Sequence, residues 1–265
     1  MPALVALVKH VPDTWSTKSL EEDFTLDRAA ADEVIDEINE YSVEQALRIR
    51  EAHPDAGFRV VALSMGTERA EEALRKALSM GADDAVLLVD DSLAGSDAMG
   101  TAWALHNAIN TIDDVALIIA GNASSDGQMG MIPGILAEYR QLPALTTVAD
   151  VSVDTAAGVV EATRTDHQGS YEVSASYPAV VSINERAAKP RFPNFKGIMA
   201  AKKAEITRID LAAIGVDASQ VGVAHSATVV QAATPRPERG SGEIIRDHGE
   251  AGKAIADYLA NEGLL

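Results

Sequence analysis

Four short apolar runs that do not alternate with polar residues are the feature that most constrains how this chain can fold. They cover residues 4–8, 60–63, 86–89 and 115–120, and Val, Leu, Ile and Ala dominate them. Strands buried on both faces have this pattern, which is typical of parallel sheets covered by helices on each side. Helix-like stretches separate the runs, as in βαβ units. The sequence therefore predicts an α/β fold with helices on both faces of a mostly parallel sheet.

The helix-like stretches carry apolar residues at the spacing of an amphipathic helix. After Gly66, apolar residues recur at intervals of three and four between positions 70 and 78. Thr67 stands where an N-cap is expected, and Gly81 follows the predicted last turn. Residues 41–51 and 97–112 have the same periodicity. A further helix is predicted from about 131–133 to 141, because proline, here Pro133, is tolerated in a first turn.

The second half of the chain has a different pattern. β-Branched residues are frequent in segments 146–153, 159–163, 171–176 and 179–183, and residues 154–158 have the composition of a hairpin connection. These segments predict added mixed or antiparallel strands. Prolines and glycine at 234–240 predict a linker, and residues 249–262 predict a final helix. We therefore expect an α/β domain over residues 1–222 and a linker with a C-terminal helical arm over residues 223–265.

Charge and cysteine content exclude several classes of function. Lys and Arg total 22 against 40 for Asp and Glu, which gives a formal net charge of -18. A field of that sign repels nucleic acid and anionic lipid, so neither is expected as a partner. The absence of cysteine excludes disulfides, thiolate zinc sites, cysteine-ligated clusters and thiol nucleophiles. There is no apolar run of about 18 residues and no secretory signal pattern. We expect a cytoplasmic protein without direct membrane insertion.

A glycine-rich loop after the run at 115–120 is the first candidate for binding. It follows a parallel strand and precedes a helix, which is where open α/β sheets bind ligands. Glycines let the backbone approach a phosphate, and the helix would supply free N–H groups. The loop matches neither the dinucleotide fingerprint nor a P-loop, and an ordinary turn has the same composition. Spacing alone leaves nucleotide binding and a plain turn equally open. The loop residues are Gly121, Asn122, Ala123, Ser124, Ser125, Asp126, Gly127, Gln128, Met129 and Gly130.

A second candidate precedes the helix predicted near residue 41. Asp36, Glu37, Ile38 and Asn39 offer polar groups that could hold a ribose or a base edge. The alternative is helix capping by Asn39, with Glu40 in the positive first turn. The physics of helix ends alone favours capping.

A basic segment is the clearest anomaly in this acidic chain. Seven Lys or Arg residues and one acid, Glu205, lie from Arg186 to Arg208. The same segment contains two phenylalanines, two prolines and Met199. Prolines reduce the entropy lost on binding, and apolar anchors inside a charged rim are typical of docking surfaces. A solvated basic face is the alternative, but the aromatic residues favour docking.

No group of residues points to catalysis. The six histidines lack the spacing of metal ligands, and there is no G-x-S-x-G nucleophile elbow. Asp154, Glu161 and Asp166 could pair in space, but such pairs arise more often by accident on a surface than as an acid and its base. We therefore predict neither catalytic residues nor a metal site.

Four segments occur in the order found in one known family. They are residues 8–14 (VKHVPDT), 41–48 (YSVEQALR), 77–83 (ALSMGAD) and 178–203, which ends in IMAAKK. Together they resemble the electron transfer flavoprotein beta subunits, and the resemblance covers essentially the whole chain. It implies a Rossmann-like, adenine-nucleotide-binding α/β fold. In that family the beta subunit forms a heterodimer with an alpha subunit, which holds most of the FAD, and the beta subunit buries one AMP.

The resemblance also implies an electron carrier rather than an enzyme. In the family, electrons from acyl-CoA and other flavin dehydrogenases, as in fatty acid oxidation, reach FAD and pass to a membrane quinone oxidoreductase. A recognition loop, here about residues 184–203, docks the dehydrogenases through one apolar anchor that falls at Phe195. The C-terminal helix would pack on the alpha subunit as an arm. The implied docking residues are Arg191, Phe192, Phe195, Lys196, Ile198 and Met199.

The AMP site can be carried over by position. Asp126 matches the acid of the family's loop. Asp36 and Glu37 stand where relatives often have Asn-Pro, the loop after Asp126 lacks their Asp-x-x-Gln pattern, and Thr165 stands in place of a common acid. The implied site consists of Leu7, Asp36, Glu37, Ile38, Asn39, Met65, Gly121, Asn122, Ala123, Ser124, Ser125, Asp126, Gly127, Gln128, Met129, Gly130, Met131 and Ile132.

Two alternative functions stay open at this point. The beta pocket could hold a second FAD in an electron-bifurcating flavoprotein, which the altered loop leaves possible. An adenine-nucleotide hydrolase or ligase of related fold would need a phosphate-cradling motif and metal-binding carboxylates. Neither feature is seen in the sequence.

Overall fold

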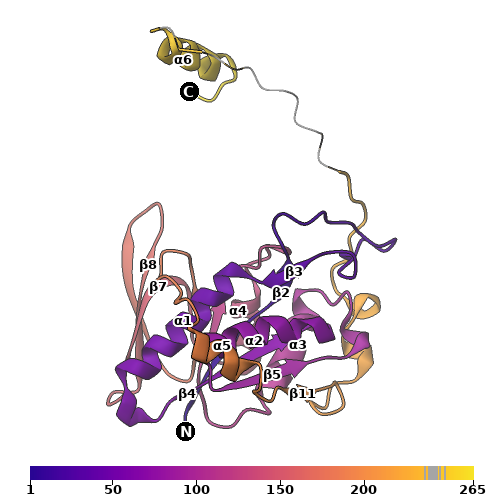
Figure 1. Ribbon diagram of the computed structural model, residues 1–265, viewed down its shortest axis with the longest axis vertical. Coiled ribbons are helices and arrows are strands. Elements are labelled where there is room, and N and C mark those ends of the chain that lie inside the picture. Colours follow the sequence, from indigo (N-terminus) through magenta and orange to yellow (C-terminus); the bar gives the residue numbers. More distant parts are fainter. Residues whose placement is uncertain (236, 238–243, 245, 248) are drawn as a thin grey trace. The chain divides into compact units, whose positions relative to one another are not determined.

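A computed structural model describes residues 1–265 except 236, 238–243, 245 and 248 (Figure 1). Contacts within the chain divide it into two compact units, Met1–Val230 and Gln231–Leu265. The described residues of the second unit include the helix α6 (Ala251–Asn261), which lies inside the range predicted for a final helix. Most of the linker predicted at 234–240 lies outside the described residues.

A nine-stranded sheet forms the centre of the first unit. Its order is β11-β5-β4-β1-β6-β10-β7-β8-β9. Neighbours from the first strand in this order to β7 pair in parallel, whereas the last two pairings are antiparallel. The predicted parallel sheet with added antiparallel strands is therefore confirmed. The strands are β1 (Ala3–Leu7), β4 (Arg59–Met65), β5 (Asp84–Leu88), β6 (Val115–Gly121), β7 (Ala144–Asp154), β8 (Val159–Thr165), β9 (Ser170–Ser176), β10 (Ala179–Ile183) and β11 (Thr207–Ile209).

Helices cover both faces of this sheet, as predicted. One face is covered by α1 and α2, whose side chains Leu47 and Leu74 are fully buried against it. The other face is covered by α3 and α4, which bury Ile109 and Leu136. None of the helices in the described ranges is both long and apolar enough to cross a membrane. The α-helices of this unit are α1 (Glu37–Ala52), α2 (Glu71–Met80), α3 (Ala98–Ile109), α4 (Ile132–Arg140) and α5 (Phe195–Ala201).

One of the two predicted N-caps differs in the structure. Helix α1 begins at Glu37 after the N-cap residue Asp36, so capping by Asn39 is wrong. Asn39 lies inside the first turn, where its side chain accepts a hydrogen bond from another segment instead. Thr67 is the N-cap residue of a 3₁₀ turn, Glu68–Ala70, that leads directly into α2, but its side chain makes no cap hydrogen bond. At the start of α1, a tertiary contact therefore overrides the local capping preference.

The shortest elements escaped prediction. A two-stranded antiparallel ribbon, β2 (His10–Pro12) and β3 (Glu33–Ile35), closes a long excursion over residues 13–32. Helix α5 lies where a loop was predicted, because Asn194 caps it by accepting a hydrogen bond from Gly197 N at 2.8 Å. Such elements are too short to show periodicity. The 3₁₀ turns are η1 (Pro54–Ala56), η2 (Glu68–Ala70), η3 (Asp91–Leu93), η4 (Ala218–Gln220) and η5 (Val223–His225).

The sheet reverses its winding between β1 and β6. Strands β4 and β5 extend it on one side of β1, and β10 and β7 extend it beyond β6. In open parallel sheets the connections diverge at such a point and leave a crevice at the carboxyl ends of the two strands. The segments that leave these ends begin at Val8 and Asn122.

Candidate functional site

Three segments distant in sequence meet at the carboxyl ends of β1 and β6, the position at which open parallel sheets leave a crevice. They are the end of β1, the first turn of α1 and the loop after β6. Lys9 N donates to Asn39 Oδ1 at 2.8 Å, and Ser125 N donates to Asp36 Oδ2 at 2.8 Å. The structure therefore brings together the two candidate segments that the sequence analysis singled out separately.

Gly121 permits this close approach. A Cβ atom there would lie 2.6 Å from Ile38 Cγ2 and 2.9 Å from Asn39 Nδ2. A Cβ atom does not come this close to a heavy atom to which it is not bonded, so any larger residue must displace the first turn of α1. Glycine at this strand end is thus required by packing, whatever the loop binds.

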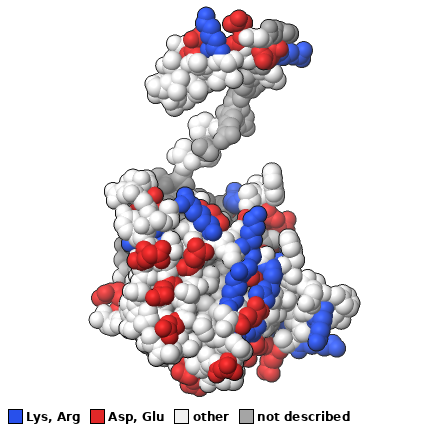
Figure 2. Space-filling view, turned by 90° about the vertical axis from the view of Figure 1, so that its left-hand side faces the viewer, with Lys and Arg blue, Asp and Glu red and all other residues white. Residues whose placement is uncertain are grey.

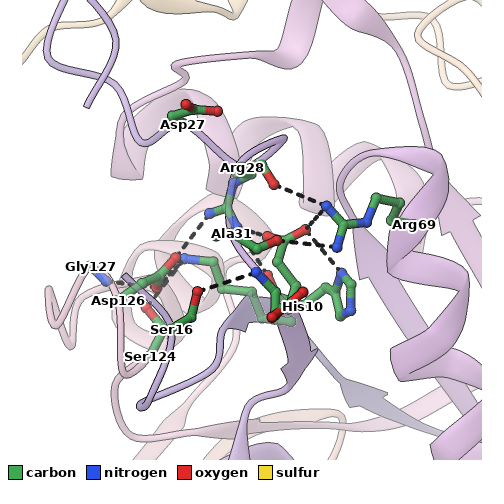
Figure 3. A network of polar contacts seen from close by, with 12 residues as sticks. His10, Ser16, Asp27, Arg28, Ala31, Arg69, Ser124, Asp126 and Gly127 are labelled. Carbon is green, nitrogen blue, oxygen red and sulfur yellow. Dashed lines mark hydrogen bonds and ion pairs between the residues drawn. The ribbon is translucent and has the colours of Figure 1, made fainter. Parts of the chain in front are cut away.

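Asp126 is the electrostatic centre of the loop (Figure 3). Its carboxylate lies 2.6 Å from Lys9 Nζ and 2.9 Å from Arg28 Nη2, and it accepts a hydrogen bond from Gly127 N at 2.6 Å. Burial opposes ionisation of this carboxyl group, but the Lys9 charge and the hydrogen bonds outweigh it. The pKa of Asp126 is therefore well below its usual range. The loop is held by a permanent negative charge between two cations.

The same network continues to the β2–β3 ribbon and to η2, the 3₁₀ turn that precedes α2. Arg28 also binds the buried Glu33 at 2.7 Å, and Arg69 lies 3.8 Å from it. His10 Nδ1 lies 3.3 Å from Glu33 Oε2. Burial lowers the pKa of His10 despite the attraction of Glu33. These contacts fasten the excursion over residues 13–32 to the crevice.

Asp36 differs from Asp126 in its electrostatics. Burial raises the pKa of Asp36, against the stabilising hydrogen bond from Ser125 N, and the neighbouring Asp126 charge raises it further. The carboxyl groups of Asp36 and Asp126 therefore have pKa shifts of opposite direction, although both lie at this loop. Glu37 is exposed and takes no part in these contacts.

The second half of the loop offers free backbone donors. Among the contacts of the described residues, no acceptor is found for the N–H groups of Met129, Gly130 and Met131. Gly130 has a φ of 63°, which turns the chain into α4. The first N–H groups of α4 also lack partners within the helix. Such donors, at the positive end of a helix, can bind a phosphate or carboxylate.

The remaining predicted residues lie around the crevice. Leu7 ends β1 and Met65 ends β4, and both pack on the α3–α4 face of the sheet together with Ile132. Asn122 N donates to Ile183 O at 2.9 Å, which anchors the loop to β10. Cavities of about 310 and 240 Å³ lie elsewhere, beside Phe58 and beside Trp103.

Sequence reasoning did not assign Lys9, Arg28, Glu33 or Arg69 to the site. Lys9 could have been found, since it directly follows the strand at the reversal of the sheet. Arg28 belongs to the excursion, Glu33 to the short strand β3 and Arg69 to the turn η2, and nothing in their spacing links them to Asp126.

Of the three carboxylates considered for an acid–base pair, Glu161 lies within β8, and the other two accept hydrogen bonds in turns. Asp154 accepts hydrogen bonds from Ala156 N and Ala157 N, both at 2.9 Å. Asp166 accepts from Gln168 N at 2.8 Å. No group of three or more His, Asp or Glu side chains suited to a metal ion is found within the described part of the chain.

The predicted docking residues occupy α5 and the loop before it. Arg191 differs from the rest, because its guanidinium forms ion pairs with Glu44 and Glu51 of α1. Figure 2 shows one face of the molecule, on which Lys and Arg side chains form a stripe beside scattered Asp and Glu. The exposed members of the set are Phe192, Phe195, Lys196, Ile198 and Met199.

Comparison with known proteins identifies the family. A family model described as "Electron transfer flavoprotein domain" matches residues 23–214. The electron transfer flavoprotein subunit beta of Mycobacterium tuberculosis is 50% identical over 268 residues, covering 100% of both chains. That of Megasphaera elsdenii is 31% identical over 97% of this chain and 96% of its own. The caffeyl-CoA reductase-Etf complex subunit CarD of Acetobacterium woodii is 29% identical over 91% of each chain. The chain belongs to the electron transfer flavoprotein family.

Proposed function

We propose that this chain is the beta subunit of a heterodimeric electron transfer flavoprotein. It carries electrons and catalyses no bond chemistry of its own. The observation that carries the proposal is full-length similarity at 50% identity to a protein named subunit beta. The alpha subunit holds most of the FAD, which supplies the redox chemistry when bound. The complex works in the cytoplasm.

The beta subunit binds AMP as a structural ligand in the crevice between β1 and β6. Support comes from the donors: the free N–H groups of Met129, Gly130 and Met131 precede the N-terminus of α4 and suit a phosphate. The Lys9–Asp126–Arg28 contacts hold that loop in place. Leu7 and Met65 offer apolar contact for a base at the ends of their strands.

The dehydrogenase partners bind through the segment that contains α5. Phe192 and Phe195 are 95% and 79% exposed, and basic residues surround them. An apolar pocket with an acidic rim on acyl-CoA and other flavin dehydrogenases is the complementary surface. A membrane quinone oxidoreductase then accepts the electrons from FAD.

A second candidate function is electron bifurcation, with FAD in place of AMP in the beta pocket. The observation in its favour is the similarity to a subunit of the caffeyl-CoA reductase-Etf complex. Ligand extraction from the complex purified with its alpha subunit decides between the two. One FAD and one AMP per heterodimer support the carrier, whereas two FADs support bifurcation.

Removal of AMP tests its structural role. A ligand present at about 100 times its Kd stabilises the folded state by about 2.7 kcal/mol. We therefore expect AMP-free heterodimer to unfold at a lower temperature while its electron-transfer rate at saturating dehydrogenase changes little. Equal thermal stability with and without AMP would contradict this role.

A further inference from the structure

Arg191 is clamped to α1 by two glutamates. Its backbone N–H and Nε donate to Glu44 Oε2 at 3.1 and 2.7 Å, and Nη2 reaches Glu44 Oε1 at 3.2 Å. Nη1 and Nη2 donate to the two carboxylate oxygens of Glu51 at 2.5 and 2.9 Å. This bidentate geometry fixes both the position and the orientation of the guanidinium plane.

The clamp is fully ionised. Burial opposes the charge on Glu44, whose side chain is 3% exposed, but hydrogen bonds from Arg191 and Arg48 outweigh it and lower the pKa of Glu44. Hydrogen bonds from Arg191 likewise lower the pKa of Glu51. Removal of one partner would leave a charge without its counterpart in a partly buried place, which is unfavourable.

The far end of the same segment is fixed to α2. Arg75 donates to Ala201 O at 2.5 Å and to Ala204 O at 3.1 Å. A Cβ on Gly197 would lie 2.5 Å from Ser79 O, so α5 lies directly against the end of α2. Residues 191–204 are therefore held at both ends by the body of the protein.

The exposed aromatic side chains contrast with this fixed backbone. Phe192 directly follows the clamped Arg191 and is 95% exposed, and Phe195 begins α5 and is 79% exposed. An unrestrained segment would lower its free energy by folding such side chains back onto apolar surface. A clamp on the residue before Phe192 opposes that collapse.

We propose that Glu44 and Glu51 are positioning residues for docking: through Arg191 they hold the segment from Phe192 to Met199 in its partner-binding conformation before a dehydrogenase arrives. This inference rests on the proposed function of that segment. A preorganised segment loses less conformational entropy on association. The clamp therefore strengthens binding of the dehydrogenase and leaves the rate of the electron-transfer step itself unchanged.

The test uses the flavin-loaded heterodimer and an acyl-CoA dehydrogenase that reduces it. In the double variant Glu44→Gln and Glu51→Gln we expect the KM for the heterodimer to rise about tenfold, the effect of ordering one or two further side chains, with kcat unchanged. Arg191→Lys should give an intermediate KM, because an ammonium cannot form the bidentate contact. Arg59→Gln is the matched control. It removes one positive charge and an ion pair with Asp84 that has no part in the clamp, and should leave KM unchanged.

A second measurement separates this inference from the proposed function. Amide hydrogen exchange over residues 191–203 should become faster in the double variant and stay at the wild-type rate in Arg59→Gln. Unchanged exchange would overturn the clamp whatever the partner does. If exchange rises but KM stays at the wild-type value while Phe195→Ala raises KM, the segment docks without needing the clamp, and the inference fails alone. If Phe195→Ala also leaves KM unchanged, the proposed docking function fails.

Discussion

Replacement of Gly121 by alanine tests the packing of α1 against the nucleotide loop. The added Cβ would lie 2.6 Å from Ile38 Cγ2 and 2.9 Å from Asn39 Nδ2. Favourable carbon contacts lie at about 3.5–4.0 Å, so the first turn of α1 must move by about 1 Å. Overpacking of this kind lowers the free energy of unfolding by about 1–3 kcal/mol. In a domain of this size a loss of about 2 kcal/mol lowers Tm by about 4–8 °C.

Thermal unfolding of the purified heterodimer and its AMP content together measure this effect. Because Asn39 binds Lys9 N and Lys9 binds Asp126, displacement of α1 should also lower the AMP content. Gly134→Ala is the matched control, since a Cβ at Gly134 meets no atom within 4 Å. It should leave Tm unchanged or raise it slightly. A Gly121→Ala protein with wild-type Tm and full AMP content would refute the reasoning.

Three further substitutions follow from the site and the docking segment. Asp126→Asn removes the negative charge that Lys9 and Arg28 share; these two side chains are 39% and 32% exposed, so water can hydrate them again. We expect the free energy of unfolding, measured in urea, to fall by about 1–3 kcal/mol. Wild-type stability would contradict this expectation. Burial holds the pKa of His10 below 6.5, so the unfolded state takes up the proton first as pH falls, and stability is full above 6.5 and declines below it. His10→Gln should flatten that decline, and an unchanged slope of stability against pH would show that His10 has no part in it. Phe195→Ala should raise the KM for the heterodimer at least about tenfold without changing its FAD content. For the wild type, KM should also rise with salt concentration, because salt screens the basic residues. A KM that does not depend on salt would argue against electrostatic steering of the dehydrogenase by these residues.

The sheet was predictable because its strands are buried on both faces. The continuous apolar runs exist for that reason, and each of the four lies within or within one residue of a strand in the structure. The helices were predictable from their apolar stripes, but their starts were not. Asn39 makes the case: its side chain has the chemistry of a cap, yet it binds Lys9 N, thirty residues earlier in the chain. A contact of that kind is set by the tertiary fold and leaves no trace in local sequence.

The candidate site was predictable only where local sequence marks it. The loop after β6 is marked by its glycines and by its place after a strand. Arg28 and Glu33 are not marked in this way, because the excursion that carries Arg28 and the short strand that begins at Glu33 show no periodicity. Glu33 reaches the loop only through Arg28, which binds Asp126. Arg191 was predicted as a docking residue from its neighbours. In the structure its guanidinium pairs with Glu44 of α1. The two residues are 147 positions apart, so local sequence does not predict this pairing.

Helix α1 contacts both the crevice and the docking segment. Its first turn lies against Gly121, and Glu44 and Glu51 follow further along the same helix. An α-helix is stiff and advances about 1.5 Å per residue, so the number of residues in α1 sets the distance between the two regions. If α1 tilts at its N-terminal end, the residues at its C-terminal end are displaced as well. An insertion or deletion between Asn39 and Glu44 would put one end out of register, whereas substitutions that keep the length can alter either end separately.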